Sequence, residues 1–201
     1  MPPAKHRLPP PDAEPDNTNT KNPGYKINLD MKHAMAMVSF RVYDGGRLSD
    51  NNVNFTKLEI KNTDGGTSPF KTGSGTMSLV DGTIGGSLSV GTVVRTITNY
   101  ILMRQVDETG TEGEYAFKST GTSMSTINGK TVSRTVSAIV YPTTFSDGDI
   151  NAIITLKEGN NAEVTYPVSL PGNVWEANNN YIYTFSAGRN KLTVVDVTVE
   201  A

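Results

Sequence analysis

Hydrophobic and polar residues alternate with a period of two along much of this chain, and this alternation predicts β-strands. The clearest example runs from Tyr181 to Phe185, where Tyr181, Tyr183 and Phe185 would share one face of a strand. The only tryptophan, Trp175, stands six residues earlier, where it is placed to cap the same core. An aromatic row of this kind is typical of a half-buried strand at a sandwich edge or in a hairpin.

A second strand is predicted from His33 to Tyr43, and its two faces differ in character. One face is wholly apolar and contains Ala34, Ala36, Val38, Phe40 and Val42. The small alanines there suit a close approach to an opposing sheet. The other face carries methionines beside polar residues, so we expect that face to be partly covered as well.

Further alternating segments, separated by turn residues, predict an all-β chain with little or no helix. Aspartate or asparagine before glycine supplies the positive φ angles of tight hairpin turns. Frequent turns between short strands favour an antiparallel β-sandwich of Greek-key, transthyretin-like or immunoglobulin-like type. The expected strands run from Lys32 to Tyr43, Val53 to Lys61, Thr76 to Val80, Ser87 to Val94, Asn99 to Gln105, Glu114 to Lys118, Val132 to Tyr141, Ile150 to Lys157, Glu163 to Leu170, Tyr181 to Ala187 and Lys191 to Glu200.

The N-terminal segment differs from the rest in composition. Seven of the 11 prolines lie between Pro2 and Pro23, among polar and acidic residues. Proline removes backbone donors, and such a composition offers little to bury, so residues 1–24 are expected to be a disordered tail or linker. Residues 25–201 are expected to form a single β-sandwich domain.

Charge and cysteine content exclude several classes of function. The chain has 18 basic and 20 acidic residues, a net charge of −2, which argues against nucleic acid or an anionic membrane as a partner. It has no cysteine, so thiol nucleophiles, thiolate metal sites and disulfides are all excluded. No apolar run reaches the roughly 20 residues of a membrane-spanning helix.

Candidate catalytic and metal-binding residues are few, and each has a simpler interpretation. The only histidines are His6, in the proline-rich segment, and His33, which has no serine or carboxylate forced near it by sequence. Asp107–Glu108 and the Asp147/Asp149 pair could contribute to a calcium loop but lack the remaining ligands, and turn formation explains the second pair. Gly82, Gly85 and Gly86 are not followed by a phosphate-binding lysine and a helix. We therefore expect no enzyme activity, cofactor or metal.

Three groups of segments, taken in order, resemble the fimbrillin-like proteins of Bacteroidales, the subunits and anchors of type V pili. The first is the histidine-alanine strand from His33 to Phe40. The second contains a Tyr-Pro segment and two strands, and the third contains the Trp-x-Ala turn and the alternating tyrosines. The later segments are Ala138 to Pro142, Ile153 to Leu156, Val164 to Pro171, Trp175 to Ala177, Tyr181 to Thr184 and Asn190 to Val194.

The chain departs from the family pattern in three ways. Asn178 stands where the family usually has glycine, and asparagine best tolerates the left-handed backbone after glycine. Family members typically carry a lipidated N-terminal cysteine and two sandwich domains, whereas this chain resembles mainly the C-terminal domain. Many members also continue beyond the last strand, while this sequence stops at Glu200–Ala201.

The resemblance implies a structural subunit or adhesin of a bacterial surface fimbria. Such a protein would be exported through the periplasm to the cell surface or outer membrane, and its partners would be other pilus subunits and a host or bacterial surface ligand. Subunits would join by strand exchange, in which an extended segment of one completes a sheet of the next. We expect the donor between Lys191 and Glu200, with Leu192 and Val194 on one face and Val195, Val197 and Val199 on the other.

A carbohydrate-binding module on a similar sandwich is the alternative function. In that case aromatic residues on loops, such as Tyr100, Tyr115 or Tyr141, would stack on sugar rings. This alternative predicts an exposed, coplanar pair of aromatic side chains. Burial of these tyrosines would exclude it.

Overall fold

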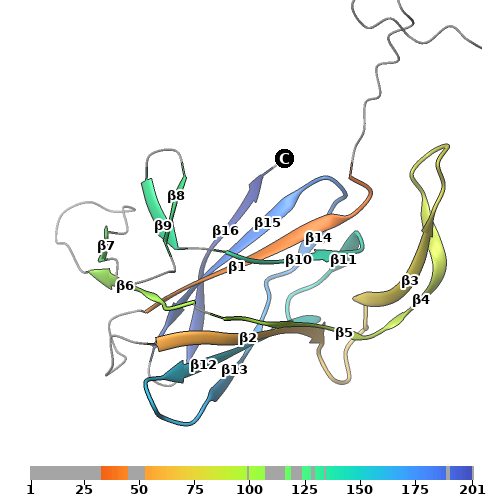
Figure 1. Cartoon of the computed structure of the whole chain (residues 1–201). Helices are drawn as coiled ribbons and strands as arrows, with labels where there is room; N and C mark the ends of the chain where they lie inside the picture. The colour runs from red at the N-terminus through yellow and green to blue at the C-terminus, as the bar shows by residue number, and fades with distance from the viewer. Residues whose placement is uncertain are drawn as a thin grey trace, which may run out of the picture. The chain divides into compact units, whose positions relative to one another are not determined.

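The computed structural model describes residues 33–44, 53–98, 100–106, 116–118, 124–127, 130–133, 135–188 and 191–200. Within these ranges the regular elements are β-strands, arranged in two main sheets and three two-stranded ones (Figure 1). The predicted all-β sandwich is thereby confirmed. The expected tail, residues 1–24, lies outside the described residues, and the expected single domain over residues 25–201 stays a prediction.

The first sheet is built around β1, which pairs with β15 along one side and with β10 and then β6 along the other. The order across the sheet is β16, β15, β1, β6 and β7, and β10 also pairs with β1. β1 is antiparallel to β10 but parallel to β15 and β6, so the sheet is mixed. Its strands are β1 (Ala36–Asp44), β6 (Met103–Val106), β7 (Ala116–Lys118), β10 (Val136–Val140), β15 (Asn180–Ala187) and β16 (Leu192–Glu200).

The second sheet is wholly antiparallel, with the order β13, β12, β2 and β5. After β5 the chain passes along the start of β2, where Phe55 donates its backbone N–H to the Tyr100 carbonyl (2.8 Å). From there it enters the first sheet at β6. The strands of the second sheet are β2 (Val53–Asn62), β5 (Thr92–Thr96), β12 (Ile150–Glu158) and β13 (Val164–Ser169).

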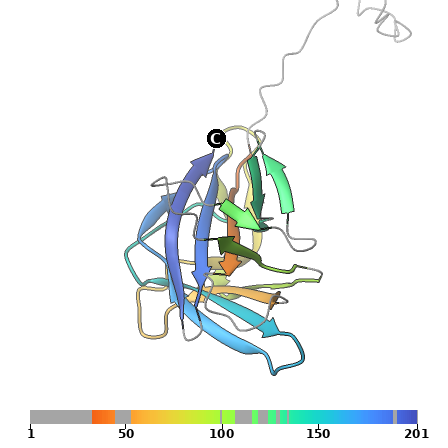
Figure 2. The same ribbon diagram turned by 90° about the vertical axis from the view of Figure 1, so that its left-hand side faces the viewer.

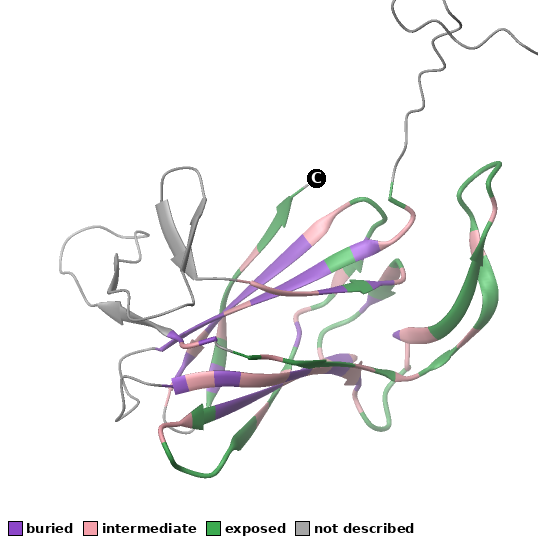
Figure 3. Cartoon of the chain, viewed as in Figure 1, coloured by how far each residue is buried: buried purple, intermediate pink, exposed green. Residues whose placement is uncertain are grey.

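The core lies where the two sheets face each other, and the buried positions follow the period-two pattern of the sequence (Figure 3). The predicted apolar face of β1 is confirmed, because Val38, Phe40 and Val42 are fully buried. The opposite face is partly covered, as expected, with Ser39 buried and Met37 exposed. The inner face of the second sheet contributes Leu58, Ile60, Ala152 and Ile154. Burial of these apolar side chains is the main stabilising term for the fold.

Three short pairs of strands lie outside the main sheets. They are the hairpin of β3 (Lys71–Met77) and β4 (Ile84–Val90), the pair β8 (Met124–Ile127) and β9 (Lys130–Ser133), and the pair β11 (Thr143–Phe145) and β14 (Asn173–Trp175). The β3–β4 hairpin extends away from the two sheets (Figure 1). The strands β8, β11 and β14 were not predicted, because segments of three or four residues are too short to show a period.

Several predicted strand boundaries are wrong, for local reasons. The strand expected from Thr76 to Val80 ends at Met77, because the following residues form the tip of the β3–β4 hairpin. The Asp81–Gly82 turn was predicted, and Gly82 adopts a φ of 73° there. The strand expected from Ser87 to Val94 is divided at Gly91 into β4 and β5.

Candidate functional site

The predicted donor segment forms β16, which is the edge strand of the first sheet. It runs antiparallel to β15, from the pair Ala187/Leu192 near the turn to the pair Asn180/Glu200 at the far end. β16, β15 and β1 lie side by side in Figure 2. Among the described residues no strand pairs with the outer side of β16. The backbone N–H and C=O groups of every second residue of β16 point to that side. These groups are therefore available to another chain.

A β-bulge in β16 changes which residues face the core. The register shifts between Thr184 and Phe185, so that Thr184 opposes Asp196 while Phe185 opposes Val194. Val195 is the inserted residue. Because an inserted residue reverses the alternation, Val194 and Val197 both pack against the core. The strict alternation that we expected, with Val194 and Val197 on opposite faces, is wrong.

Four apolar residues of β16 therefore form one row, called here the apolar row: Leu192, Val194, Val197 and Val199. Opposed residues of an antiparallel pair project to the same face of the sheet. The row lies directly opposite Ala187, Phe185, Tyr183 and Tyr181 of β15, all of which are buried. β16 thus covers one side of the aromatic row that the sequence predicted.

The aromatic residues beneath β16 form a cluster that connects the first sheet to β14. Trp175 is fully buried, and its Nε1–H donates a hydrogen bond to the Tyr183 hydroxyl (2.9 Å). Phe40 stacks on Tyr183 and Phe185, with ring centroids 5.7 and 6.0 Å apart. Burial raises the pKa of Tyr183 above its usual value, so the hydroxyl stays protonated. The predicted core role of Trp175, Tyr181, Tyr183 and Phe185 is confirmed.

The nearby edge of the second sheet is protected in a way that β16 is not. In β13 the Leu170 N–H donates to the Ile150 carbonyl (2.9 Å), so Pro167, three positions earlier, has its backbone nitrogen directed outward. Proline at such a position offers no donor and blocks an incoming strand. β16 contains no proline and has only its bulge to disturb the edge. Strand addition is therefore easier at β16 than at β13.

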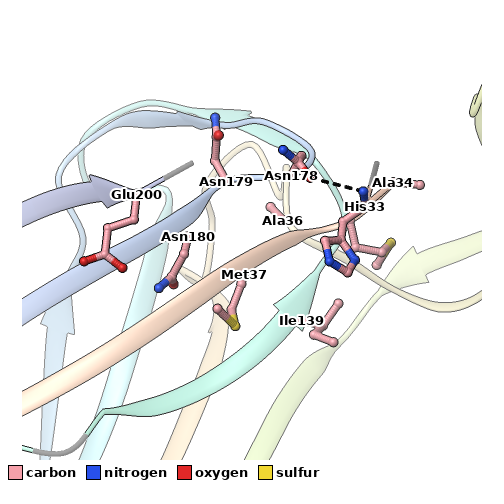
Figure 4. A pocket seen from close by; sticks show the side chains of 10 residues that line it. His33, Ala34, Ala36, Met37, Ile139, Asn178, Asn179, Asn180 and Glu200 are labelled. Atoms are coloured by element: carbon pink, nitrogen blue, oxygen red, sulfur yellow. Dashed lines mark hydrogen bonds between the residues drawn. The ribbon is translucent and has the colours of Figure 1, made fainter. Parts of the chain in front are cut away.

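A pocket of about 430 Å³ lies at the far end of β16, where β1 and β15 begin and β10 ends. We call it the terminal pocket. Its wall is apolar along β1 and β10 and polar along the turn before β15 (Figure 4). Met37 and Ile139, which oppose each other in the β1–β10 pair, are both exposed in it. The lining residues are His33, Ala34, Met35, Ala36, Met37, Ile139, Asn178, Asn179, Asn180 and Glu200.

Asn178 shapes the polar wall of the terminal pocket. Its φ angle is 67°, the left-handed conformation expected where the family pattern has glycine. Its backbone N–H donates to the Met35 carbonyl (3.0 Å), and its side-chain Oδ1 accepts a hydrogen bond from the His33 backbone N–H (3.2 Å). The next residue, Asn179, accepts the Met37 backbone N–H at its carbonyl (2.9 Å). These bonds attach the turn to the start of β1.

Substituting Asn178 should separate the backbone requirement from the side-chain hydrogen bond. Asn178→Ala is expected to lower the free energy of unfolding by about 1–2 kcal/mol, because alanine keeps the Cβ atom in the left-handed conformation but lacks the polar side chain that makes this conformation tolerable for asparagine. Asn178→Gly removes the same hydrogen bond but relieves the strain, so its stability should stay close to that of the unsubstituted chain. Urea denaturation measures both. An equal loss in the two variants would mean that the His33 contact, rather than the φ angle, determines the residue.

Comparison with known proteins decides the family. A family model described as fimbrillin-like matches residues 13–201. This chain belongs to the fimbrillin-like family. Comparison with curated proteins gives no match.

Solved structures similar to this fimbrillin-like chain come from species of Bacteroides. A fimbrial protein from Bacteroides vulgatus is 14% identical, with a TM-score of 0.45, and the alignment covers 83% of this chain and 54% of that one. A candidate cell adhesion protein from Bacteroides uniformis is 17% identical, with a TM-score of 0.44 and coverage of 84% and 51%. Another from Bacteroides ovatus is 12% identical, with a TM-score of 0.41 and coverage of 83% and 44%. The chain spans about half the length of these structures.

The ionisable residues weighed as catalytic or metal-binding groups do not come together in the described part of this fimbrillin-like protein. His33 lies exposed at the terminal pocket. Asp147 and Asp149 hold their turn, as expected, by accepting backbone N–H groups of Gly172 (2.6 Å) and Ser146 (2.9 Å). The described residues include no group of three or more histidine, aspartate or glutamate side chains that could hold a metal ion. His6, Asp107 and Glu108 lie outside these residues.

The tyrosines named for the carbohydrate alternative do not form a platform in the described residues. Tyr100 is fully buried, and its ring lies edge-on to that of Phe55, with the ring centroids 5.3 Å apart. Tyr141 is partly buried against the β3–β4 hairpin, where its hydroxyl donates to the Gly73 carbonyl (3.0 Å). Tyr115 lies outside the described residues. Tyr100 is thereby excluded as a sugar-binding residue.

Sequence reasoning found the β16 segment but missed the terminal pocket. Met37 and Ile139 looked like ordinary members of alternating strands, and only the register of β1 with β10 makes them neighbours. The exposed methionine face of the predicted first strand was the one available signal.

Proposed function

We propose that this fimbrillin-like protein is a structural subunit of a bacterial surface fimbria, and that subunits join by exchange of β16. One observation carries the proposal: β16 is an edge strand whose apolar row lies opposite the buried aromatic row of β15. A strand and the surface that accepts it are thus present on one chain. The same strand could occupy the equivalent surface of the next subunit.

The energetics of exchange favour an edge strand of this kind. Each contact that β16 makes with β15 would be replaced by the same contact between two subunits, so little interaction energy is lost. Leu192 is the only buried residue of β16, and its other residues are half-buried or exposed. Removing β16 from its own sheet therefore costs less than removing a central strand such as β1 or β12.

The family and the neighbours support a location at the cell surface. The neighbour from Bacteroides vulgatus is a fimbrial protein, and fimbriae are surface structures. We propose export through the periplasm and partnership with other fimbrial subunits. The residues of the proposed strand contact are Leu192, Val194, Val195, Val197 and Val199, with Val195 at the bulge. No enzymatic reaction forms part of the proposal.

A reversible disulfide tests whether β16 must leave its own sheet. The chain contains no cysteine, so Ile182→Cys with Thr198→Cys introduces a single pair. These residues oppose each other across β15 and β16, at a separation suitable for a disulfide. Their side chains lie on the face of the sheet away from the apolar row. The oxidised variant should hold β16 in place, whereas the reduced variant should leave it free to exchange.

The readout is uptake of a fluorescent peptide with the sequence of residues 191–201, measured by anisotropy. We expect uptake by the reduced variant and by the unsubstituted chain, and none by the oxidised variant. The reduced form of the same variant controls for any effect of the substitutions themselves. A peptide carrying Val194→Ser and Val197→Ser should fail to bind, because its apolar row is interrupted. Equal uptake by the oxidised and reduced forms would show that strand exchange is wrong.

A further inference from the structure

The tip of the β3–β4 hairpin exposes two adjacent large apolar side chains. Leu79 and Val80 are 92% and 96% exposed, and Met77 beside them is 51% exposed. The hairpin tip, defined here as residues 78–83, stands at the end of an element that extends away from both sheets (Figure 3). Adjacent aliphatic side chains that are almost fully exposed gain nothing within the monomer. Such a tip is typical of a contact with another molecule.

Hydrogen bonds hold the hairpin tip in one conformation. The backbone N–H groups of Ser78 and Gly82 donate to the carbonyls of Thr83 and Ser78, both at 2.9 Å. The Asp81 carboxylate accepts the Thr83 backbone N–H at 3.0 Å. Hydrogen bonds to the backbone of Thr83, and then to the side chains of Ser78 and Thr83, lower the pKa of Asp81 to about 2. A tip that is already ordered loses little conformational entropy when it binds.

Strand β3 of the hairpin is fixed to Tyr141, the residue that follows β10. The Tyr141 hydroxyl donates to the Gly73 carbonyl (3.0 Å), and the Tyr141 ring lies so close to Gly75 that a Cβ atom there would be 2.9 Å from the ring. Tyr141 follows Ile139 by two residues, and Ile139 lines the pocket. The hairpin is therefore attached to the chain close to Ile139, one of the residues that line the pocket.

We propose that the hairpin tip of one subunit inserts Leu79 and Val80 into the terminal pocket of a neighbouring copy of this chain. The inference rests on the proposed function, because it supplies a second contact between the same subunits. A projection that fits a different surface of the next copy is a heterologous contact, and such contacts build filaments when they do not close into rings. The pocket also ends at Glu200, the last residue of β16, so the two contacts would be continuous.

The chemistry of the two surfaces favours a second copy over a lipid bilayer. Leu79 and Val80 would meet the apolar wall formed by Met37 and Ile139. Asp81 is ionised at neutral pH, and hydrocarbon would leave its charge unpaired. In the pocket the side-chain amides of Asn178 and Asn180 could donate hydrogen bonds to this carboxylate. The Asn179 amide already donates to Glu176 (3.3 Å), and the lining also holds the carboxylate of Glu200.

Photo-crosslinking tests the contact directly. With p-benzoylphenylalanine at position 80 of the full 201-residue chain, irradiation should give a covalent dimer. Mass spectrometry should place the crosslink in residues 33–37, 139 or 178–180 of the second copy. A chain with the probe at position 174, where Val174 is 48% exposed on β14, serves as the control and should not give this product. Absence of a dimer, or a crosslink to another surface, overturns the proposal.

Sedimentation measures how much self-association is lost when residues of this contact are replaced. Leu79→Ser with Val80→Ser should weaken association about 10-fold or more, as expected when central apolar contacts are removed. Val90→Ser, on the same hairpin and 57% exposed, should have no effect. Ile139→Lys in the pocket should weaken association similarly, and adding it to the tip variant should cause little further loss. Unchanged association of the tip variant, or Leu79-dependent binding to phospholipid vesicles, contradicts the proposal.

The same experiments separate this contact from strand exchange. The tip contact does not require β16 to move, so the crosslink should also form in the oxidised Ile182→Cys, Thr198→Cys variant. If that variant crosslinks but the peptide is taken up equally by both redox forms, only strand exchange is wrong. If peptide uptake behaves as expected but the crosslink is missing, only the tip contact is wrong.

Discussion

Replacing Trp175 with alanine is expected to lower the free energy of unfolding by about 3–5 kcal/mol, because a large core side chain is lost and the cavity cannot close. Trp175 is fully buried and packs edge-on against three aromatic rings. Its ring centroid lies 6.2 Å from that of Phe70, 4.7 Å from that of Phe145 and 6.4 Å from that of Tyr183. These rings come from separate parts of the chain. The cavity would therefore be surrounded by side chains that cannot all move into it.

Urea denaturation followed by circular dichroism measures this loss, since the variant lacks the only tryptophan. Tyr183→Phe is the matched control, because it keeps the ring but leaves the Trp175 Nε1–H without its acceptor at 2.9 Å. That variant should lose about 1–3 kcal/mol, the cost of an unsatisfied buried donor. If Trp175→Ala were no less stable than Tyr183→Phe, the ring would contribute little beyond its hydrogen bond.

Replacing Asn62 with alanine is expected to be the second most destabilising change, at about 2–4 kcal/mol, because two buried backbone groups lose their partners. The Asn62 side chain donates to the Phe70 carbonyl and accepts the Phe70 N–H, both at 2.8 Å. Both residues are buried, so water cannot replace these bonds at no cost. The pair closes the loop that leads from β2 to β3 and holds Phe70 against Trp175.

Asn151→Ala provides the comparison for Asn62→Ala. Asn151 also makes a side-chain hydrogen bond, accepting from the Ser169 hydroxyl at 3.0 Å, but this bond is exposed. Its loss should cost less than about 0.5 kcal/mol, since water replaces the partner. Denaturation of both variants under the same conditions tests the difference. Similar losses would contradict the argument that burial determines the cost.

Strands whose two faces differ in polarity could be predicted well from the sequence. For β1 and β15 the alternation identified Val38, Phe40, Tyr181, Tyr183 and Phe185 as inward-facing, and all five are buried. Periodicity succeeds for these residues because the large apolar side chains alternate along each strand and pack against the opposing sheet. It did not show that the other face of β15 is covered as well, with Ile182 and Thr184 both 4% exposed. The same reasoning placed Trp175 in this core.

The strand prediction failed where large apolar residues are exposed instead of buried in the core. The run from Met77 to Val80 looks like the end of a strand, yet Leu79 and Val80 form an exposed tip. The hydrogen bonds of Ser78 and Asp81 stabilise a turn at this place and so override the preference of these residues for a strand. The signal in the sequence was Asp81–Gly82, which was recognised as a turn but placed after the strand instead of inside the hairpin.

For the candidate site, the sequence located the segment but not its geometry. Leu192, Val194, Val197 and Val199 were identified as apolar members of one strand, but were assigned to two faces. The bulge at Val195 places them in one row opposite β15. An inserted residue is stable only if the side chains in the shifted register pack well against the partner strand. The identity of that partner cannot be derived from the sequence of β16 alone.

By itself the sequence determined that this protein is all-β, which large apolar side chains of β1 and β15 face the core, and where several turns occur, because these depend on local periodicity and on residues such as glycine and asparagine at positive φ. The tertiary structure decided the parallel pairing of β1 with β15, the bulge in β16, the terminal pocket and the exposure of Leu79 and Val80. The parallel pairing and the terminal pocket depend on contacts between segments far apart in the chain, whereas the bulge and the exposed tip depend on hydrogen-bonded partners that the alternation within a single strand does not show. β1 and β15 are separated by more than a hundred residues, and no local pattern in either strand encodes its partner.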